Sequence, residues 1–180
     1  VALSEAMGAG VWFEGIRHHI NFPNRHPNAK GILPVDAGAI RNTFGEADLV
    51  MLIGGPFFEE VWFTSGLPFP DGATVVQLEE AAARLAHNHA VDAGLVGHLP
   101  TSLGDLTATL KASGDYQSAA KARNDALAAE STEARAAYEA RSQRAWDRDP
   151  MSMARAMAEI NAGTPDNAVV VEEAITAGLD

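Results

Sequence analysis

The sequence contains no cysteine and only a small share of basic residues. The lack of cysteine excludes disulfides, thiolate metal sites and a cysteine nucleophile, and it is typical of a cytoplasmic protein. Lys and Arg number 13 against 24 Asp and Glu, which gives a formal net charge of −11 at pH 7. Because binding to nucleic acids and anionic membranes rests on basic residues that neutralise phosphates, we expect no nucleic acid and no membrane as partner.

Long hydrophobic runs and the common catalytic motifs are absent as well. No apolar run approaches the roughly 20 residues that cross a bilayer as a helix. The sequence holds no Walker loop, no G-x-S-x-G, no H-E-x-x-H and no EF-hand pattern. Of the six histidines, only His87 and His89 are spaced to lie on one side of a strand, and no third ligand accompanies them. The motifs therefore predict neither a metal site nor a particular reaction.

What the sequence does contain is the pattern of an α/β domain. With 180 residues, 47% of them hydrophobic, the chain can form one domain with a core and an appendage. Compact apolar runs bounded by turn residues alternate with helical segments, which is typical of a parallel sheet covered by helices. The expected elements are a helix ending near Gly10, a strand at 11–14, a loop at 15–35, a helix at 37–44 capped by Asp36, strands at 49–53, 74–78 and 91–96, and a helix at 100–112.

The composition changes after Gly114. Residues 116–148 are rich in Ala, Glu, Arg and Gln and contain no Gly or Pro. They are predicted to form one connector helix about 50 Å long, at about 1.5 Å per residue. Asp149-Pro150 is expected to end this helix, and Ser152 to cap a second helix that reaches about residue 162. A strand predicted at 168–171 would then open a second domain.

The turn after the strand at 49–53 is the place where a binding site is expected. Ligands of open parallel sheets bind at the carboxyl ends of the strands, and Gly54-Gly55-Pro56 lies at such an end. The adjacent carboxylate pairs Glu59-Glu60 and Glu172-Glu173 diverge on a strand, so neither pair is an acid–base dyad by its spacing. Four aromatic residues close to the glycine pair either line a site or, as we expect, fill a core or subunit interface: Phe57, Phe58, Trp62 and Phe63.

Several segments, in order along the chain, resemble the benzoylformate decarboxylase branch of the thiamine diphosphate enzymes. Residues 22–31 (FPNRHPNAKG) are similar to the F-P-x-R-H-P-x-x-x-G loop of that branch. Residues 48–58 (DLVMLIGGPFF) resemble the strand and turn D-x-V-x-x-I-G-x-P-x-F that follow the loop. Residues 91–98 (VDAGLVGH) resemble the end of the middle domain, and residues 150–152 (PMS) and 166–173 (DNAVVVEE) resemble the opening of the diphosphate-binding domain.

This resemblance implies a Rossmann-like α/β fold and three parts of the chain. Residues 1–114 would form the middle domain without its first strand, residues 115–149 the connector helix, and residues 150–180 the beginning of the diphosphate-binding domain. The chain would be a fragment of a lyase or carboligase that uses thiamine diphosphate and Mg²⁺ on a 2-oxo acid or acyl substrate. Its partners would be the remaining domains of the same protein in a homo-oligomer, and the fragment would bind no cofactor and have no activity alone.

The resemblance assigns two cofactor-binding residues and no catalytic or metal-binding residue. Glu173 matches a glutamate at the end of the third domain's first strand. Thr176 matches a hydroxyl residue that touches the diphosphate of the cofactor, a contact that suits an anion beside a helix start. Benzoylformate decarboxylase carries an active-site histidine in the loop after the glycine pair, where this chain has Val61. The substrate therefore stays open.

Two other functions stay open. The aromatic residues and the alanine-rich helix also suit a non-catalytic oligomerisation or spacer module. The middle domain of some relatives binds FAD or ADP, although the chain has no glycine-rich phosphate loop of the G-x-G-x-x-G type. For every one of these functions, a missing first strand would leave unpaired backbone groups on the neighbouring strands. We expect another chain or a terminal segment to fill that gap.

Overall fold

The computed structural model describes residues 1–15, 21–58, 64–169 and 171. The chain divides into two compact units, Val1–Ser131 and Thr132–Asp180. The boundary falls inside the helix α4 (Gly114–Arg144), so each unit is described by itself. None of the helices in the described ranges is long and apolar enough to cross a membrane.

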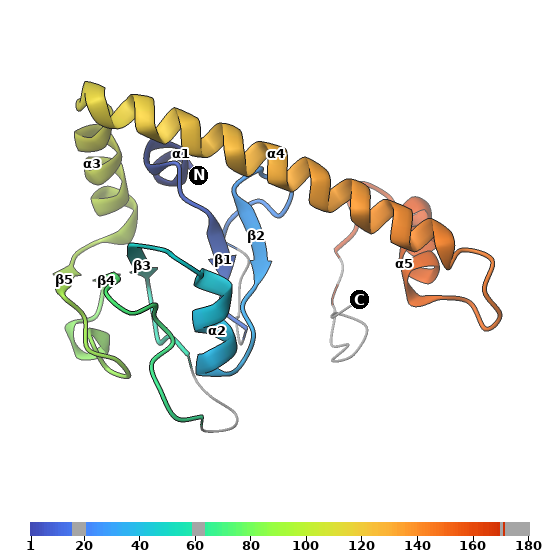
Figure 1. The fold of residues 1–180 in the computed structure, drawn as a ribbon, viewed down its shortest axis with the longest axis horizontal. Coiled ribbons are helices and arrows are strands. Elements are labelled where there is room, and N and C mark those ends of the chain that lie inside the picture. The colour runs from blue at the N-terminus through green and yellow to red at the C-terminus, as the bar shows by residue number, and fades with distance from the viewer. Residues whose placement is uncertain (16–20, 59–63, 170, 172–180) are drawn as a thin grey trace. The chain divides into compact units, whose positions relative to one another are not determined.

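Two parallel sheets form the centre of the first unit (Figure 1). Strand β1 (Val11–Phe13) pairs with β2 (Ala29–Ile32) in one sheet. The second sheet has the order β3-β4-β5, with β3 (Leu49–Ile53), β4 (Thr74–Glu79) and β5 (Ala93–Val96) all parallel. This arrangement confirms the α/β fold with parallel, Rossmann-like strands, but in two sheets rather than one.

Helices connect and cover these strands. Helix α1 (Ala2–Met7) precedes β1, α2 (Ala37–Phe44) joins β2 to β3, and α3 (Leu99–Lys111) follows β5. A short 3-10 helix, Ala82–Arg84, follows β4. Helix α1 packs against α3. Helical connections of this kind are what parallel strands require, because a hairpin turn cannot join strands that run in the same direction.

The core of the first unit lies between α2 and the strands. The Asp36 carboxylate accepts a hydrogen bond from the Ala39 backbone N–H at 2.9 Å and so caps α2, as the sequence predicts. The Trp12 ring of β1 meets the Phe44 ring of α2 edge to face, with centroids 5.6 Å apart. Helix α2 therefore packs against both sheets. The buried apolar side chains of this core are Leu33, Ile40, Val50, Leu52, Phe58, Phe69 and Val75.

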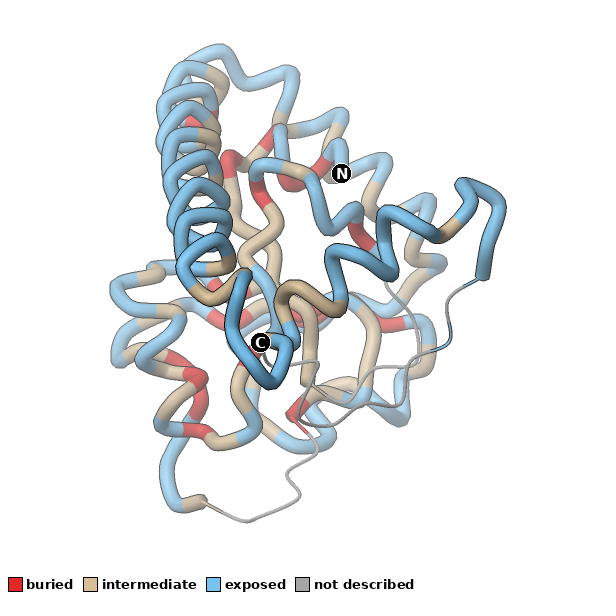
Figure 2. Tube along the Cα trace, turned by 90° about the vertical axis from the view of Figure 1, so that its right-hand side faces the viewer, coloured by how far each residue is buried: buried red, intermediate tan, exposed pale blue. Residues whose placement is uncertain are grey.

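The second unit contains the end of α4 and helix α5 (Met153–Gly163). The Ser152 hydroxyl accepts from the Arg155 N–H at 3.3 Å and caps α5, as expected. The Arg155 guanidinium lies over the Trp146 ring, 5.5 Å from its centroid, and donates to the Trp146 carbonyl at 3.0 Å. Figure 2 shows α4 exposed along most of its length, and Ala120 is its one buried residue.

Three sequence predictions about elements are wrong. The predicted loop at 15–35 contains strand β2, because pairing with β1 imposes a strand on a segment that has a single large apolar residue, Ile32. The connector helix ends at Arg144 rather than at residue 148. Residues 168, 169 and 171 form no strand, and Val169 and Val171 are 89% and 90% exposed. A strand needs a neighbour to pair with, and these described residues pair with none.

Candidate functional site at the carboxyl edge of the second sheet

A buried carboxylate lies at the carboxyl ends of β3 and β4. Glu79 is only 2% exposed. Its Oε1 atom accepts hydrogen bonds from the backbone N–H groups of Glu80 at 2.9 Å and Ala81 at 3.2 Å. Its Oε2 atom is buried and has no hydrogen-bond partner among the described residues. A Cβ atom on Gly55 would lie 2.7 Å from that oxygen, so the second glycine of the pair is required for this close approach.

A second carboxylate at this edge caps helix α3. Glu80 Oε1 accepts from the Leu99 N–H at 2.9 Å, where the helix dipole favours a negative group. His98 Nδ1 lies 3.0 Å from the Thr101 hydroxyl in the same turn. Because carboxylates already occupy the positive end of α3 and the sheet edge beside it, a phosphate group would meet like charge here. The geometry therefore opposes a nucleotide diphosphate at this edge.

The turn after the glycine pair carries backbone strain. Phe58 has a φ of 54°, a left-handed conformation that is uncommon for a bulky residue. Its side chain is buried and its ring lies 5.8 Å from Phe69 and 5.6 Å from His89. The Phe57 ring is 6.0 Å away. Both phenylalanines thus join the core, as expected. Strained residues often cluster at functional sites, which singles out this turn.

A hollow lies on a different surface of the first unit. It measures about 540 Å³ and lies at the amino ends of β3 and β4. Arg41 borders it and lies 3.8 Å from the Asp71 carboxylate. Ligands of parallel sheets bind at the opposite, carboxyl ends of the strands. The hollow is therefore a less favourable candidate than the Glu79 edge. It is lined by Arg41, Asn42, Gly45–Asp48 and Pro70–Ala73.

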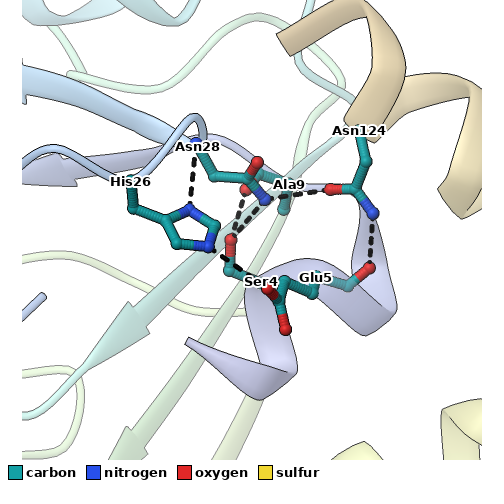
Figure 3. A network of polar contacts seen from close by, with 6 residues as sticks. All are labelled: Ser4, Glu5, Ala9, His26, Asn28 and Asn124. Atoms are coloured by element: carbon teal, nitrogen blue, oxygen red, sulfur yellow. Dashed lines mark hydrogen bonds and ion pairs between the residues drawn. The ribbon is translucent and has the colours of Figure 1, made fainter. Parts of the chain in front are cut away.

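The loop at 22–31, which carries the resemblance, has a structural role (Figure 3). Asn28 is 2% exposed, and its side-chain amide donates to the Ser4 hydroxyl at 2.8 Å and to Asn124 Oδ1 at 3.0 Å. Asn124 in turn donates to the Glu5 carbonyl at 2.7 Å, and Ser4 donates to the Ala9 carbonyl at 2.8 Å. The loop thereby ties α1 to α4.

His26 takes part in the same network. The Asn28 backbone N–H donates to His26 Nδ1 at 3.1 Å, so the neutral ring carries its hydrogen on Nε2. That Nε2 atom lies 3.2 Å from Glu5 Oε1 and donates to it. The Phe22 ring packs against the imidazole edge to face at 5.0 Å. Both ring nitrogens thus make hydrogen bonds within the fold, which gives His26 a structural role rather than a catalytic one.

The remaining candidates fall outside the site. In the described ranges no three His, Asp or Glu side chains gather closely enough to hold a metal ion. His87 and His89 lie in an irregular segment between β4 and β5, not on a strand.

The sequence did not single out Glu79 and Glu80, although an acidic pair directly after an apolar run could have signalled them. Residues outside the described part of the chain are Glu59 to Phe63, including Val61, and Glu172, Glu173 and Thr176.

Comparison with known proteins decides the family. The family profile described as "Thiamine pyrophosphate enzyme, central domain" matches residues 1–106, which is more than half of the chain. The chain belongs to this family. A benzoylformate decarboxylase of Pseudomonas aeruginosa is 30% identical over 130 residues, which cover 72% of this chain and 24% of that protein. The loop at 22–31 and the strand at 48–58 are therefore similar to those of this family because the proteins are related.

Solved structures of thiamine diphosphate enzymes share the fold of this central domain. The thiamine diphosphate-dependent 4-hydroxybenzoylformate decarboxylase of Rhodococcus jostii RHA1 has a TM-score of 0.57 and 26% identity, covering 63% of this chain and 21% of that one. The benzoylformate decarboxylase of Polynucleobacter necessarius has a TM-score of 0.55 and 25% identity, covering 59% and 20%. The chain thus spans about a quarter of its curated relative and a fifth of these solved chains.

Proposed function

We propose that these residues are part of a thiamine diphosphate-dependent lyase or carboligase that acts on a 2-oxo acid or an acyl substrate. The central domain has a structural role, shapes the active site and has no activity alone. The observation that carries this proposal is the match of residues 1–106 to the central domain, together with a curated relative of which the matched part covers only 24%. The remaining domains of the same protein would supply the rest of the site, in a homo-oligomer in the cytoplasm.

The described residues do not fit the cofactor or its metal. The carboxylates of Glu79 and Glu80 are engaged by backbone N–H groups. They would also repel a diphosphate. Among the described residues no cluster offers the oxygen ligands that Mg²⁺ requires. We therefore assign no step to these residues and propose Glu173 and Thr176 as the cofactor contacts of this chain.

The chemistry would come from the cofactor. When bound, thiamine diphosphate supplies an electron sink for the bond that breaks beside the substrate carbonyl. The central domain would contribute a rigidly packed surface that shapes the active site. The packing of Phe58 against Phe69 fixes the turn after β3, and the buried Glu79 carboxylate lies close to Gly55 in this turn. This turn leads into residues 59–63, where Val61 replaces the expected histidine, so the proposal does not fix the substrate as benzoylformate.

Cofactor binding by the full-length gene product tests the proposal. Titration calorimetry with thiamine diphosphate and MgCl₂ is expected to show binding by the full-length protein and none by residues 1–180. Thr176→Ala in the full-length protein should weaken the cofactor roughly tenfold, since a hydrogen bond to a charged group contributes about 1.5–3 kcal/mol. Thr109→Ala, on the exposed side of α3, is the control. A full-length protein that binds no thiamine diphosphate would refute the enzyme assignment.

A spacer or assembly module is the second candidate. The observation that favours it is an exposed apolar side of α5, where Met153, Met157 and Ile160 are spaced for one helix face and are 40%, 43% and 57% exposed. Such a face is expected to be covered by another surface. Light scattering should then show a dimer or larger assembly of the 180-residue chain, and a clean monomer would remove this candidate.

A further inference from the structure

Residues 84–89, between the short 3-10 helix and β5, are bound to β4 through a buried amide. The Gln77 side chain of β4 is 4% exposed, and both of its polar atoms make hydrogen bonds to this segment. Its Oε1 atom accepts from the Ala86 N–H at 2.8 Å, and its Nε2 atom donates to the Arg84 carbonyl at 3.3 Å. Because an unpaired buried amide is costly, Gln77 favours this one arrangement of the segment.

Leu85 anchors the same segment on β5. A Cβ atom on Gly94 would lie 2.6 Å from Leu85 Cδ2, so the leucine side chain lies directly on the backbone of this strand. The next residue, Ala86, has a φ of 54°, a left-handed conformation that is uncommon for a residue other than glycine. Such a conformation persists only where the surrounding structure fixes it. Here Gln77 and Gly94 fix it from the two neighbouring strands.

The end of the segment contacts the turn after β3. Asn88 Nδ2 donates a hydrogen bond to the Phe57 carbonyl at 2.7 Å. The His89 ring meets Phe58 and Phe69 edge to face, with centroids 5.6 and 5.5 Å away. Residues 84–89 thus connect β4 and β5 with the turn at 54–58, and they do so through side chains.

Both segments that meet at this contact contain a residue with a left-handed backbone. Among the described residues other than glycine, only Phe58 and Ala86 have a positive φ. Backbone strain of this kind clusters where a protein positions groups for binding or chemistry. The turn at 54–58 also lies at the carboxyl end of β3, where ligands of parallel sheets bind. Two independent observations therefore assign a functional role to the conformation of this turn.

We propose that Asn88 is a positioning residue, which holds the turn at 54–58 in the conformation needed at the carboxyl edge of the second sheet. Its amide acts through the Phe57 carbonyl, and the His89 ring supports the same turn by packing against Phe58. This role rests on the proposed function, because the turn would shape the site of a 2-oxo acid or acyl substrate. Asn88 itself contacts neither substrate nor cofactor.

The exposure of Asn88 separates this role from a contribution to global stability. Asn88 lies at the surface, and its hydrogen bond to Phe57 is exposed as well. Water can replace an exposed partner, so loss of the bond leaves no buried group unsatisfied. The rings of Phe58 and Phe69 remain packed on each other without it. The bond therefore selects one backbone conformation of the turn and has little effect on the rest of the fold.

Limited proteolysis of the full-length gene product tests whether Asn88 holds the turn. Glu59-Glu60 follow the turn directly in the sequence, and a glutamyl endopeptidase cleaves after them. Asn88→Ala should raise this cleavage rate about fivefold, because the rate follows the population in which the turn has opened. Cleavage after Glu46, at an exposed position, is the internal reference and should not change, and neither should the melting temperature.

Two further variants show whether the donor of Asn88 is what matters. Asn88→Gln keeps an amide donor on a longer side chain and should restore the slow cleavage after Glu59-Glu60. His87→Ala is the matched control, because this side chain is exposed on the same segment and no hydrogen bond or ring contact joins it to the described turn. Its cleavage rate should equal that of the wild type.

Catalysis provides a readout that a merely structural role would not change. With thiamine diphosphate and MgCl₂ present, release of carbon dioxide is measured from benzoylformate and from pyruvate. Asn88→Ala should lower kcat/KM about fivefold on the acid that the wild type uses faster, at unchanged cofactor affinity, and Asn88→Gln should restore it.

Each outcome decides for or against the positioning role. Equal cleavage of wild type and Asn88→Ala after Glu59-Glu60 overturns it, and so does faster cleavage with an unchanged kcat/KM. Faster cleavage at Glu46 as well, together with a lower melting temperature, also overturns it, because Asn88 then stabilises the fold as a whole. A wild type that binds no thiamine diphosphate refutes the proposed function, and the cleavage rates alone then decide whether Asn88 holds the turn.

Discussion

At the scale of single residues, Asn28 connects segments that lie far apart in the sequence. Replacing it with alanine removes the donor to both the Ser4 hydroxyl and Asn124 Oδ1 in a buried setting. We expect Asn28→Ala to lower the free energy of unfolding by about 1–3 kcal/mol, since a buried acceptor is left unsatisfied. Thermal unfolding followed by circular dichroism measures this. Asn42→Ala, at an exposed position of α2, should change the melting temperature little. If both variants melt at the same temperature, the hydrogen-bond network of Asn28 does not stabilise the fold.

Glu79 supports a second residue-scale prediction. Glu79→Ala removes the acceptor of the Glu80 and Ala81 N–H groups at a buried position. It should destabilise the protein by about 1–3 kcal/mol. Glu79→Gln keeps one side-chain oxygen for these N–H groups and should retain most of the stability, because its amide also avoids burying a charge. Urea unfolding of both variants distinguishes them, and a glutamine variant as unstable as the alanine variant would show that the negative charge itself is required.

The sequence could identify the segments of the candidate site but not their contacts. The loop at 22–31 was recognisable from its F-P-x-R-H-P pattern, and the turn at Gly54-Gly55 from its place after an apolar strand. The partners of Asn28 are 24 and 96 residues away in the sequence, at Ser4 and Asn124. Local patterns carry no information about pairs at such separations. For the same reason, the local sequence could not show that Glu79 is buried.

At the scale of elements, the two glycines Gly8 and Gly104 make a matched test. Gly8 ends α1 with a φ of 61°, and a Cβ there would lie 2.5 Å from the Ala120 carbonyl oxygen of α4. Gly8→Ala should cost at least about 1 kcal/mol, from the left-handed backbone alone. Gly104→Ala, inside α3 with no atom within 4 Å of the added Cβ, should gain up to about 1 kcal/mol. Melting temperatures that shift in the same direction would contradict the close contact of α1 with α4.

Most elements of the first unit could be predicted because their signals are local. Asp36 caps α2 through its own side chain, and the apolar runs of β3 and β4 need no partner to be recognised. Strand β2 was missed because its Ala-Lys-Gly-Ile sequence becomes a strand only by pairing with β1. Propensity is a weak guide where a neighbouring strand decides the conformation.

At the scale of the whole molecule, the exposure of β3 differs from what its sequence predicts. The β3 sequence predicts a strand buried on both faces, whereas the structure exposes Leu49 and Ile53. The reason is that exposure depends on the neighbours of a strand, and β3 has β4 as its only described neighbour in the sheet. The expectation that another chain or a terminal segment fills the gap left by a missing first strand stays a prediction, which rests on the need of backbone groups inside a sheet for partners.

A lysine on the edge strand β3 is expected to weaken association between copies of the chain. Ile53→Lys places a charge on this strand, which is the outer one of its sheet, at a position 43% exposed. A charge at a sheet edge discourages pairing with another strand. In the 180-residue chain the substitution should therefore reduce concentration-dependent association measured by light scattering. Leu67→Lys, at a position 60% exposed and outside the sheets, should leave association unchanged. If Ile53→Lys associates as strongly as Leu67→Lys does, copies of the chain do not pair through the β3 edge.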